Sequence, residues 1–143
     1  MTLAPQHRTT LDLTLPATAA SVATARRALV DWLRDVAVAE DEVVDDLAVV
    51  VSELAANATR TAEVHGGSVT VHAAVRDGAV VLRVGNPADM WVPPTHRWDM
   101  DDPLRGGGRG LQIVRAFVDE LRVEQDLTNE RTVVTAVKAL AAT

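Results

Sequence analysis

Residues 52–58 read Ser-Glu-Leu-Ala-Ala-Asn-Ala and lie in a segment, from Asp41 to about residue 63, whose apolar residues recur at helical spacing. This periodicity predicts one long helix with Asp41 as its N-cap. Glu53 and Asn57 are four residues apart, so they share a face of the helix. Their face borders the apolar stripe, which places both groups at the rim of the core, where a cleft can form. The stripe consists of Val43, Leu47, Val51, Leu54 and Ala58.

Glu53 and Asn57 differ in how strongly they indicate a functional site. A carboxylate on a helix flank is most often simply solvated, so Glu53 alone does not indicate a site. An asparagine inside a helix is less expected, because its helix propensity is low. Asp46 lies near the same edge, seven residues before Glu53. A carboxylate and a carboxamide one turn apart therefore raise the case for a ligand site modestly, and a solvated helix flank is the alternative.

A glycine run forms the second candidate feature. Residues 106–111 read Gly-Gly-Gly-Arg-Gly-Leu and precede a segment with helical periodicity. Successive glycines let backbone N–H groups converge on an anion, and the helix that follows adds its N-terminal partial charge. Arg109 adds a full positive charge. The run follows an acidic loop and no strand, so it does not fit a dinucleotide fold, and a flexible hinge is the alternative reading.

Asn86 is the third candidate. It ends a predicted strand whose other members on the same face are apolar, so its side chain is expected to point toward the helices. Pro87 follows at once and stops the strand. A polar amide at this point could recognise the edge of a base. A turn-initiating Asn-Pro pair explains the same residues equally well.

The remaining segments complete an α+β pattern. Strands are predicted at 11–15, 69–75, 79–86, 121–126 and 131–138, and helices at 17–36 and from about 108. Asp77-Gly78 is the strongest short hairpin signal. Residues 87–105 lack periodicity and are long for a connection, which indicates a functional loop. The order predicts a two-layer sandwich, with a mixed sheet covered on one face by three helices.

Composition limits the function classes. The chain has 143 residues, which fits a single domain over 9–143 after a flexible tail at 1–8. Its net charge of −6 argues against nucleic acid or an anionic membrane as the main partner. No cysteine, signal peptide or membrane-length apolar run occurs, so a cytoplasmic location is expected. The only lysine is Lys138, which excludes a P-loop.

These motifs, in this order, resemble the GHKL ATPases. Residues 52–58 resemble the N box, and residues 108–114 (Gly-Arg-Gly-Leu-Gln-Ile-Val) resemble the Gly-Arg-Gly-Leu motif of that family. The similarity is greatest to small actinobacterial ATP-binding proteins related to anti-sigma factor serine kinases. Leu15-Pro16, Ala25-Arg26 and Trp32-Leu33 also match that subfamily, and the resemblance spans about residues 10–138.

The resemblance implies a Bergerat fold that holds ATP between the helix layer and the loop from 87 to 110. Asn57 would coordinate Mg²⁺ on the phosphates, and Glu53 would be the general base that takes a proton from a serine hydroxyl or from water. The 87–105 loop would act as a lid. The nucleotide and its phosphates would be held by Asn57, Asn86, Gly106, Gly108, Arg109, Gly110, Leu111 and Thr132.

The sequence departs from the family pattern at several of these positions. The family aspartate that accepts a hydrogen bond from the adenine amino group is Asn86 here, and the glycine two positions later is Ala88. The histidine after the N box is Thr61. The late Gly-Thr pair is Arg131-Thr132.

Three functions therefore compete. The first is an ATP- and Mg²⁺-dependent serine kinase that phosphorylates or sequesters a protein partner, such as a sigma factor or its antagonist. The second is a non-catalytic nucleotide-binding module that regulates a partner by contact alone. The third is the catalytic half of a histidine kinase, which is disfavoured because no helical hairpin with a phosphorylatable histidine precedes the domain. A homodimer is compatible with each of them.

Overall fold

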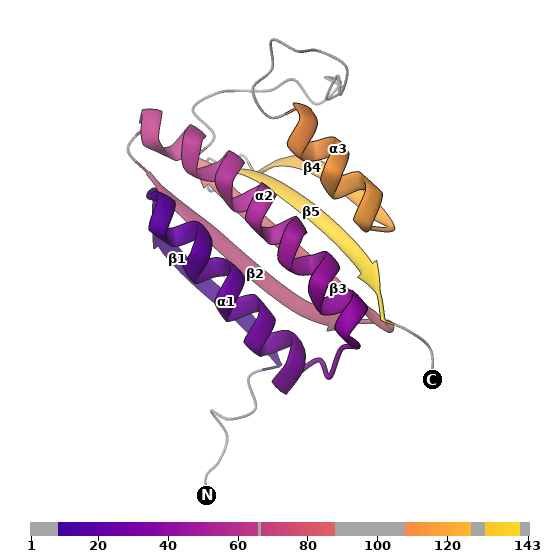
Figure 1. Cartoon of the computed structure of the whole chain (residues 1–143). Helices are drawn as coiled ribbons and strands as arrows, with labels where there is room; N and C mark the ends of the chain where they lie inside the picture. Colours follow the sequence, from indigo (N-terminus) through magenta and orange to yellow (C-terminus); the bar gives the residue numbers. More distant parts are fainter. Residues whose placement is uncertain (1–8, 66, 88–107, 127–130, 141–143) are drawn as a thin grey trace, which may run out of the picture.

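The computed structural model describes residues 9–65, 67–87, 108–126 and 131–140 of the chain (Figure 1). Its strands and helices follow the predicted order. They are β1 (Thr10–Pro16), α1 (Ala19–Asp35), α2 (Asp41–His65), β2 (Ser68–Arg76), β3 (Ala79–Pro87), α3 (Gly108–Phe117), β4 (Glu120–Asp126) and β5 (Arg131–Ala139). None of these helices is long and apolar enough to cross a membrane.

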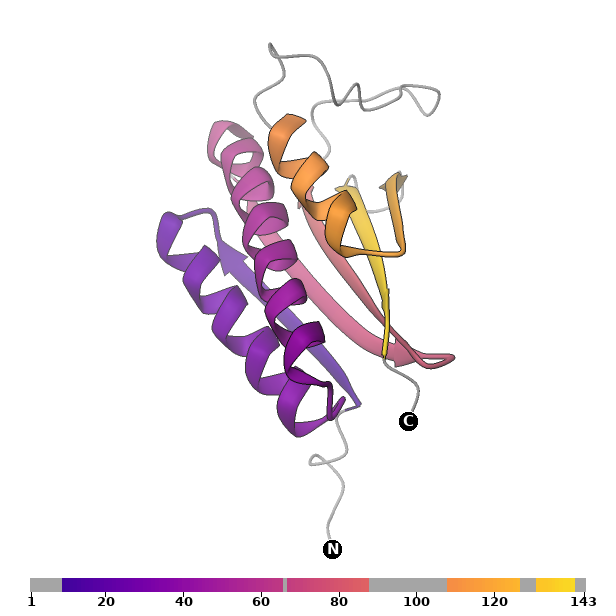
Figure 2. The same ribbon diagram turned by 45° about the vertical axis from the view of Figure 1, so that its right-hand side comes forward.

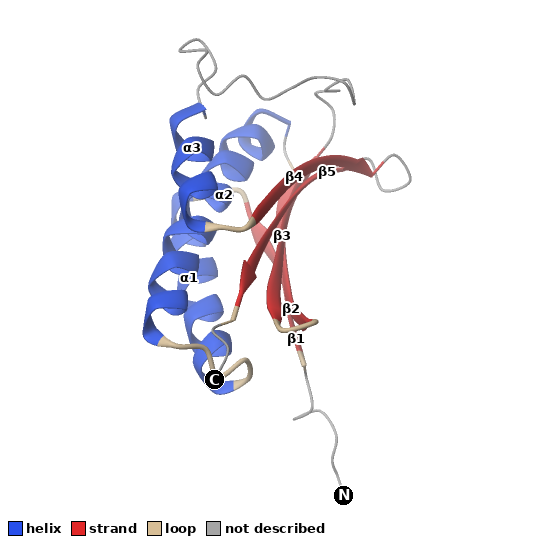
Figure 3. Ribbon diagram, turned by 90° about the vertical axis from the view of Figure 1, so that its right-hand side faces the viewer, coloured by secondary structure: helices blue, strands red, loops and turns tan. Residues whose placement is uncertain are grey.

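The strands form one sheet, and the helices lie together on one of its faces (Figure 3). This confirms the predicted two-layer sandwich. The sheet order is β1-β2-β3-β5-β4, and every pairing within the described chain is antiparallel. The prediction of a mixed sheet is therefore wrong. The crossover through α3 does bring β4 parallel to β3, but β5 returns between the two strands, so each strand has only antiparallel neighbours.

The helix α2 is the centre of the helical layer. It packs against α1, α3 and the middle of the sheet, as Figures 1 and 2 show. The predicted apolar stripe is buried along its whole length, with exposed fractions of 5% or less. The helix begins at Asp41 itself because the Glu40 carbonyl accepts the first helical bond from Val44 N–H at 3.0 Å. Glu40, not Asp41, is therefore the N-cap position.

The hairpin between β2 and β3 forms where the sequence predicted it. Asp77 and Gly78 both have positive φ, at 51° and 76°. A two-residue turn needs this left-handed backbone at both positions to match the twist of the strands. Gly78 also accepts a hydrogen bond on its carbonyl from Leu140 N–H at 2.9 Å, which ties the end of β5 to the turn.

The connection from α1 to α2 contains a strained residue. Val38 has φ of 50°, a backbone conformation that a β-branched side chain rarely adopts. Hydrogen bonds on both sides hold the segment: Ala37 N–H donates to Trp32 O at 3.1 Å and Ala39 N–H donates to Leu33 O at 2.9 Å. The side chain of Val38 is 78% exposed, so little burial offsets the strain.

Val38→Asn should therefore stabilise the protein. Asparagine tolerates the left-handed region, and strain of this kind costs on the order of 1–3 kcal/mol, so a gain of about 1 kcal/mol in the free energy of unfolding is expected. Urea denaturation followed by circular dichroism measures it. Val36→Asn is the matched control, since Val36 has negative φ and should show no such gain. A Val38→Asn protein no more stable than the native one would refute the strain.

Candidate nucleotide site

The candidate residues belong to four elements that meet at one end of the molecule. They are the second half of α2, the end of β3, the start of β5 and the first turn of α3 (Figures 1 and 2). β3 pairs with β5, and α2 packs against both β3 and α3. Residues 88–107, which include Gly106 and nearly all of the predicted lid, lie outside the described residues.

Glu53 and Asn57 lie at the border of the core, as the sequence predicted. Both side chains are half-buried, whereas the neighbouring Leu54 and Ala58 are 2% and 4% exposed. The carboxylate of Glu53 makes no hydrogen bond or ion pair with any described residue. A half-buried carboxylate without such a partner can accept a proton from a ligand, which a carboxylate fixed in a salt bridge could not do as readily.

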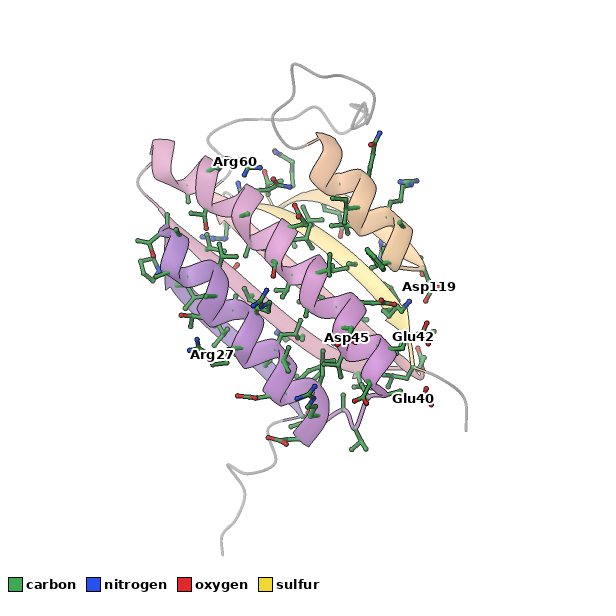
Figure 4. The ribbon with its side chains drawn as sticks, viewed as in Figure 1. Arg27, Glu40, Glu42, Asp45, Arg60 and Asp119 are labelled. Atoms are coloured by element: carbon green, nitrogen blue, oxygen red, sulfur yellow. The ribbon has the colours of Figure 1, made fainter. Side chains whose placement is uncertain are left out.

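Asn57 is held by a basic neighbour that sequence reasoning missed. Its Oδ1 accepts a hydrogen bond from Nη2 of Arg60, which lies three residues later on α2. Arg60 is exposed, and Figure 4 shows it on the C-terminal half of α2. The oxygen expected to bind a cation therefore faces a cation of the protein itself. The i, i+3 spacing places the two residues near each other on the helix, but the rotamers decide whether they form a hydrogen bond.

Asp46 has a structural role. Its Oδ2 lies 3.1 Å from Nζ of Lys138, and both side chains are about one-fifth exposed. The pair joins α2 to β5. Because Asp46 precedes Glu53 by seven residues on the same side of the helix, this ion pair helps to fix the direction in which that side points.

Asn86 and Thr132 are cross-strand neighbours. They pair in register between β3 and β5, and Thr132 pairs with Gln125 on β4. Asn86 lies two residues after the buried Val84, so it points to the helix-covered face. Gln125 Nε2 donates to Thr132 Oγ1 at 3.2 Å, while the buried Oε1 of Gln125 has no partner among the described residues.

This row adds Gln125 to the candidate residues. An unsatisfied buried acceptor is costly unless a donor reaches it, and a base carries N–H donors. No sequence pattern indicates Gln125, because only the register of β4 on β5 places it beside Thr132.

Arg131 lies on the other face of the sheet. Its Nη2 donates to the carbonyls of Ser68 at 2.7 Å and Gly85 at 3.2 Å. A Cβ at Gly85 would lie 3.3 Å from Arg131 Nε and 2.6 Å from Thr70 Oγ1, so glycine leaves the room that this arginine occupies. Burial lowers the pKa of the Arg131 guanidinium. The guanidinium lies on the opposite face of the sheet to Asn86.

The described part of the glycine motif opens a helix. Gly108, Arg109 and Gly110 form the first turn of α3, which places backbone N–H groups and the helix dipole at this end. Leu111 is 3% exposed and packs in the core, so its side chain anchors the helix. The side chain of Arg109 lies outside the described part of the chain.

These groups fit a magnesium nucleotide better than a free metal ion. Among the described residues, no three histidine or carboxylate side chains are placed to hold a metal. Mg²⁺ commonly takes one or two protein oxygens and completes its shell with phosphates and water. Asn57 Oδ1, the α3 N-terminus and the acceptor on Gln125 match a cation, a phosphate chain and a base, in that order.

Comparison with known proteins agrees with the fold. The sequence model of the histidine kinase-like ATPase domain matches residues 15–138. Among solved structures, a chain in the crystal structure of the SiaB-SiaC complex from Pseudomonas aeruginosa is similar, with a TM-score of 0.65 and 19% sequence identity. The match covers 89% of this chain and 88% of that chain. At this identity the likeness shows a shared fold and nothing further.

Proposed function

Because the chain belongs to the histidine kinase-like ATPase family, we propose that it binds ATP with Mg²⁺ and acts as an anti-sigma-factor-like serine kinase on a protein partner. One observation carries this proposal. Glu53 and Asn57 lie half-buried and one turn apart on α2, at the end where Asn86 and the first turn of α3 also lie. The protein would work in the cytoplasm, where ATP is available.

Each group has a defined part in phosphoryl transfer. Glu53 accepts the proton of the serine hydroxyl, whose oxygen forms a bond to the γ-phosphorus while the bond from that phosphorus to the β,γ-bridging oxygen breaks and ADP leaves. The α3 N-terminus holds the phosphates. Asn57 would hold the cation, which would supply neutralisation of charge on the phosphates. Asn86, Thr132 and Gln125 hold the base.

The Arg60 contact predicts an exchange of partners on binding. A guanidinium on Asn57 Oδ1 and a cation at the same oxygen would repel each other. Phosphate oxygens offer Arg60 a bidentate partner, so Arg60 moves to the phosphate chain as Asn57 turns to the cation. The side chain is exposed and long enough to change rotamer without disturbing the core.

The same contact supports the second candidate function. If Arg60 keeps Asn57 engaged, the site lacks its metal ligand and the domain regulates its partner by contact alone. Substitutions at Asn57 and Glu53 separate the two functions.

Asn57→Ala should weaken the binding of Mg·ATP by more than about tenfold, because the direct metal ligand is lost. Residual binding should no longer depend on Mg²⁺. Titration calorimetry with Mg·ATP, and with ATP plus EDTA, measures both. Asn57→Asp is the matched control, since it retains an oxygen ligand. A native protein that gives no heat with millimolar Mg·ATP would rule out nucleotide binding and leave the contact module.

Glu53→Gln should separate chemistry from binding. The amide keeps the shape of the side chain but cannot accept the proton, so phosphoryl transfer should fall by about 10²- to 10⁴-fold. The affinity for ATP should stay within about twofold, because a base acts in the transition state. Labelled ATP and a small serine-containing protein encoded nearby provide the assay, with Glu124→Gln on β4 as the control. Transfer at the native rate by Glu53→Gln would show that Glu53 is not the base.

Asn86→Asp should strengthen adenine recognition. A carboxylate accepts a stronger hydrogen bond from the exocyclic amine than a carboxamide does, and the gain should be about 1 kcal/mol, or fivefold in affinity. It should favour ATP over GTP, since guanine has an oxygen where adenine has the amine. The cost of burying the charge opposes part of the gain. Unchanged affinity and unchanged base preference would mean that Asn86 only ends its strand.

A further inference from the structure

An exposed apolar pair lies at the end of α2 remote from the candidate nucleotide site. Val36 and Val38, in the connection between α1 and α2, are 43% and 78% exposed. Hydrogen bonds fix the backbone around them, and Val38 keeps its left-handed conformation there. An apolar pair held rigidly in solvent loses little entropy on binding a partner, which distinguishes it from side chains on a free tail.

Acidic residues that form no ion pair within the described part of the chain flank the apolar pair in the sequence. Residues 31–45 contain six carboxylates and one guanidinium, a balance of −5, against −6 for the whole chain. All six carboxylates are exposed, and within the described residues none forms an ion pair. Figure 4 shows Glu40, Glu42 and Asp45 at the end of α2 opposite to Arg60. The six are Asp31, Asp35, Glu40, Asp41, Glu42 and Asp45.

Helix stability explains only part of this charge. Asp41 and Glu42 lie in the first turn of α2, where the helix dipole favours them. Asp31 and Asp35 lie at the C-terminal end of α1, where the dipole disfavours them, and four residues apart, where like charges repel. Helix stability therefore does not account for these two aspartates, whereas a cationic partner would be attracted to them.

We propose that the acidic end, defined as residues 31–45, is a docking surface for a basic protein segment that carries apolar residues between its lysines or arginines. Charge complementarity selects this occupant. A phosphate backbone or an anionic membrane would be repelled. Among the described residues no carboxylate cluster is placed to hold a metal, so the site fits no divalent ion. Val36 and Val38 would bury their side chains against the apolar residues of the segment.

The position of this surface gives it a role separate from nucleotide binding. Some five turns of α2 separate Asp45 from the end of the helix at His65, and the Figure 1 view places the two ends far apart. A partner bound at the acidic end leaves the nucleotide end accessible. The proposal therefore goes beyond the proposed kinase function and stands whether or not phosphate is transferred.

Fluorescence anisotropy with three labelled synthetic peptides tests the surface at physiological salt. The peptides are built of lysine and leucine, of lysine alone, and of glutamate and leucine. The lysine–leucine peptide should bind, the lysine peptide should bind about tenfold more weakly because it lacks apolar contacts, and the glutamate–leucine peptide should not bind. Equal binding of the first two peptides would overturn the proposal, because it would show diffuse charge attraction. Absence of lysine–leucine binding up to about 1 mM, beyond the range of specific weak interfaces, would also overturn it.

Variants locate the binding on the protein. Glu40→Gln with Glu42→Gln should weaken the lysine–leucine peptide by about tenfold, since two facing charges are removed. Glu120→Gln with Glu124→Gln on β4 changes the net charge equally and should weaken it by less than about twofold, because screening limits distant charges. Val38→Asn should weaken it by about fivefold although the variant is expected to be more stable, which excludes unfolding as the cause. Equal weakening by the two double variants would contradict a localised surface.

Discussion

The burial of one face of α2 is the constraint on which the rest of the structure depends. The helix is covered by α1 on one side, α3 on the other and the sheet beneath, so its rotation about its own axis cannot change without exposing valines and leucines. Burying a side chain of this size is worth about 1.5–3 kcal/mol. Many such residues and the Asp46–Lys138 ion pair fix the rotation of the helix. This rotation places Glu53 and Asn57 at the rim of the core.

The parts of the structure that follow from local pattern could be predicted from the sequence. The stripe of α2, the turn at Asp77-Gly78 and the inward direction of Asn86 each rest on a period or a turn rule that operates within a few residues. The prediction of a mixed sheet was wrong because the strand order depends on a contact between distant segments. No local pattern near β5 indicates that this strand lies between β3 and β4, so its antiparallel pairing on both sides could not be inferred.

The side-chain contacts in the site were beyond the sequence for a related reason. The hydrogen bond from Arg60 to Asn57 depends on which rotamer each residue adopts, and the contact from Gln125 to Thr132 depends on the register between β4 and β5. Val75 shows the same limit. It continues the alternation of the buried Val69, Val71 and Ala73 of β2, yet it is 41% exposed, because period 2 gives a direction but does not say how far the helices extend over the sheet.

Opposite chemistry therefore lies near the two ends of α2. The candidate nucleotide site combines Arg60 and Asn57 of α2 with the N-terminus of α3, and the acidic end combines carboxylates of α1 and α2 with two exposed valines between these helices. Replacement of Mg²⁺ by Mn²⁺ in the ATP complex tests the central claim most directly, because the paramagnetic ion broadens nearby nuclear magnetic resonance signals. The account predicts that the side-chain amide of Asn57 and the backbone amides near Glu53 broaden first, while those of residues 31–45 stay sharp. Broadening confined to residues 31–45, or no selective broadening, would contradict it.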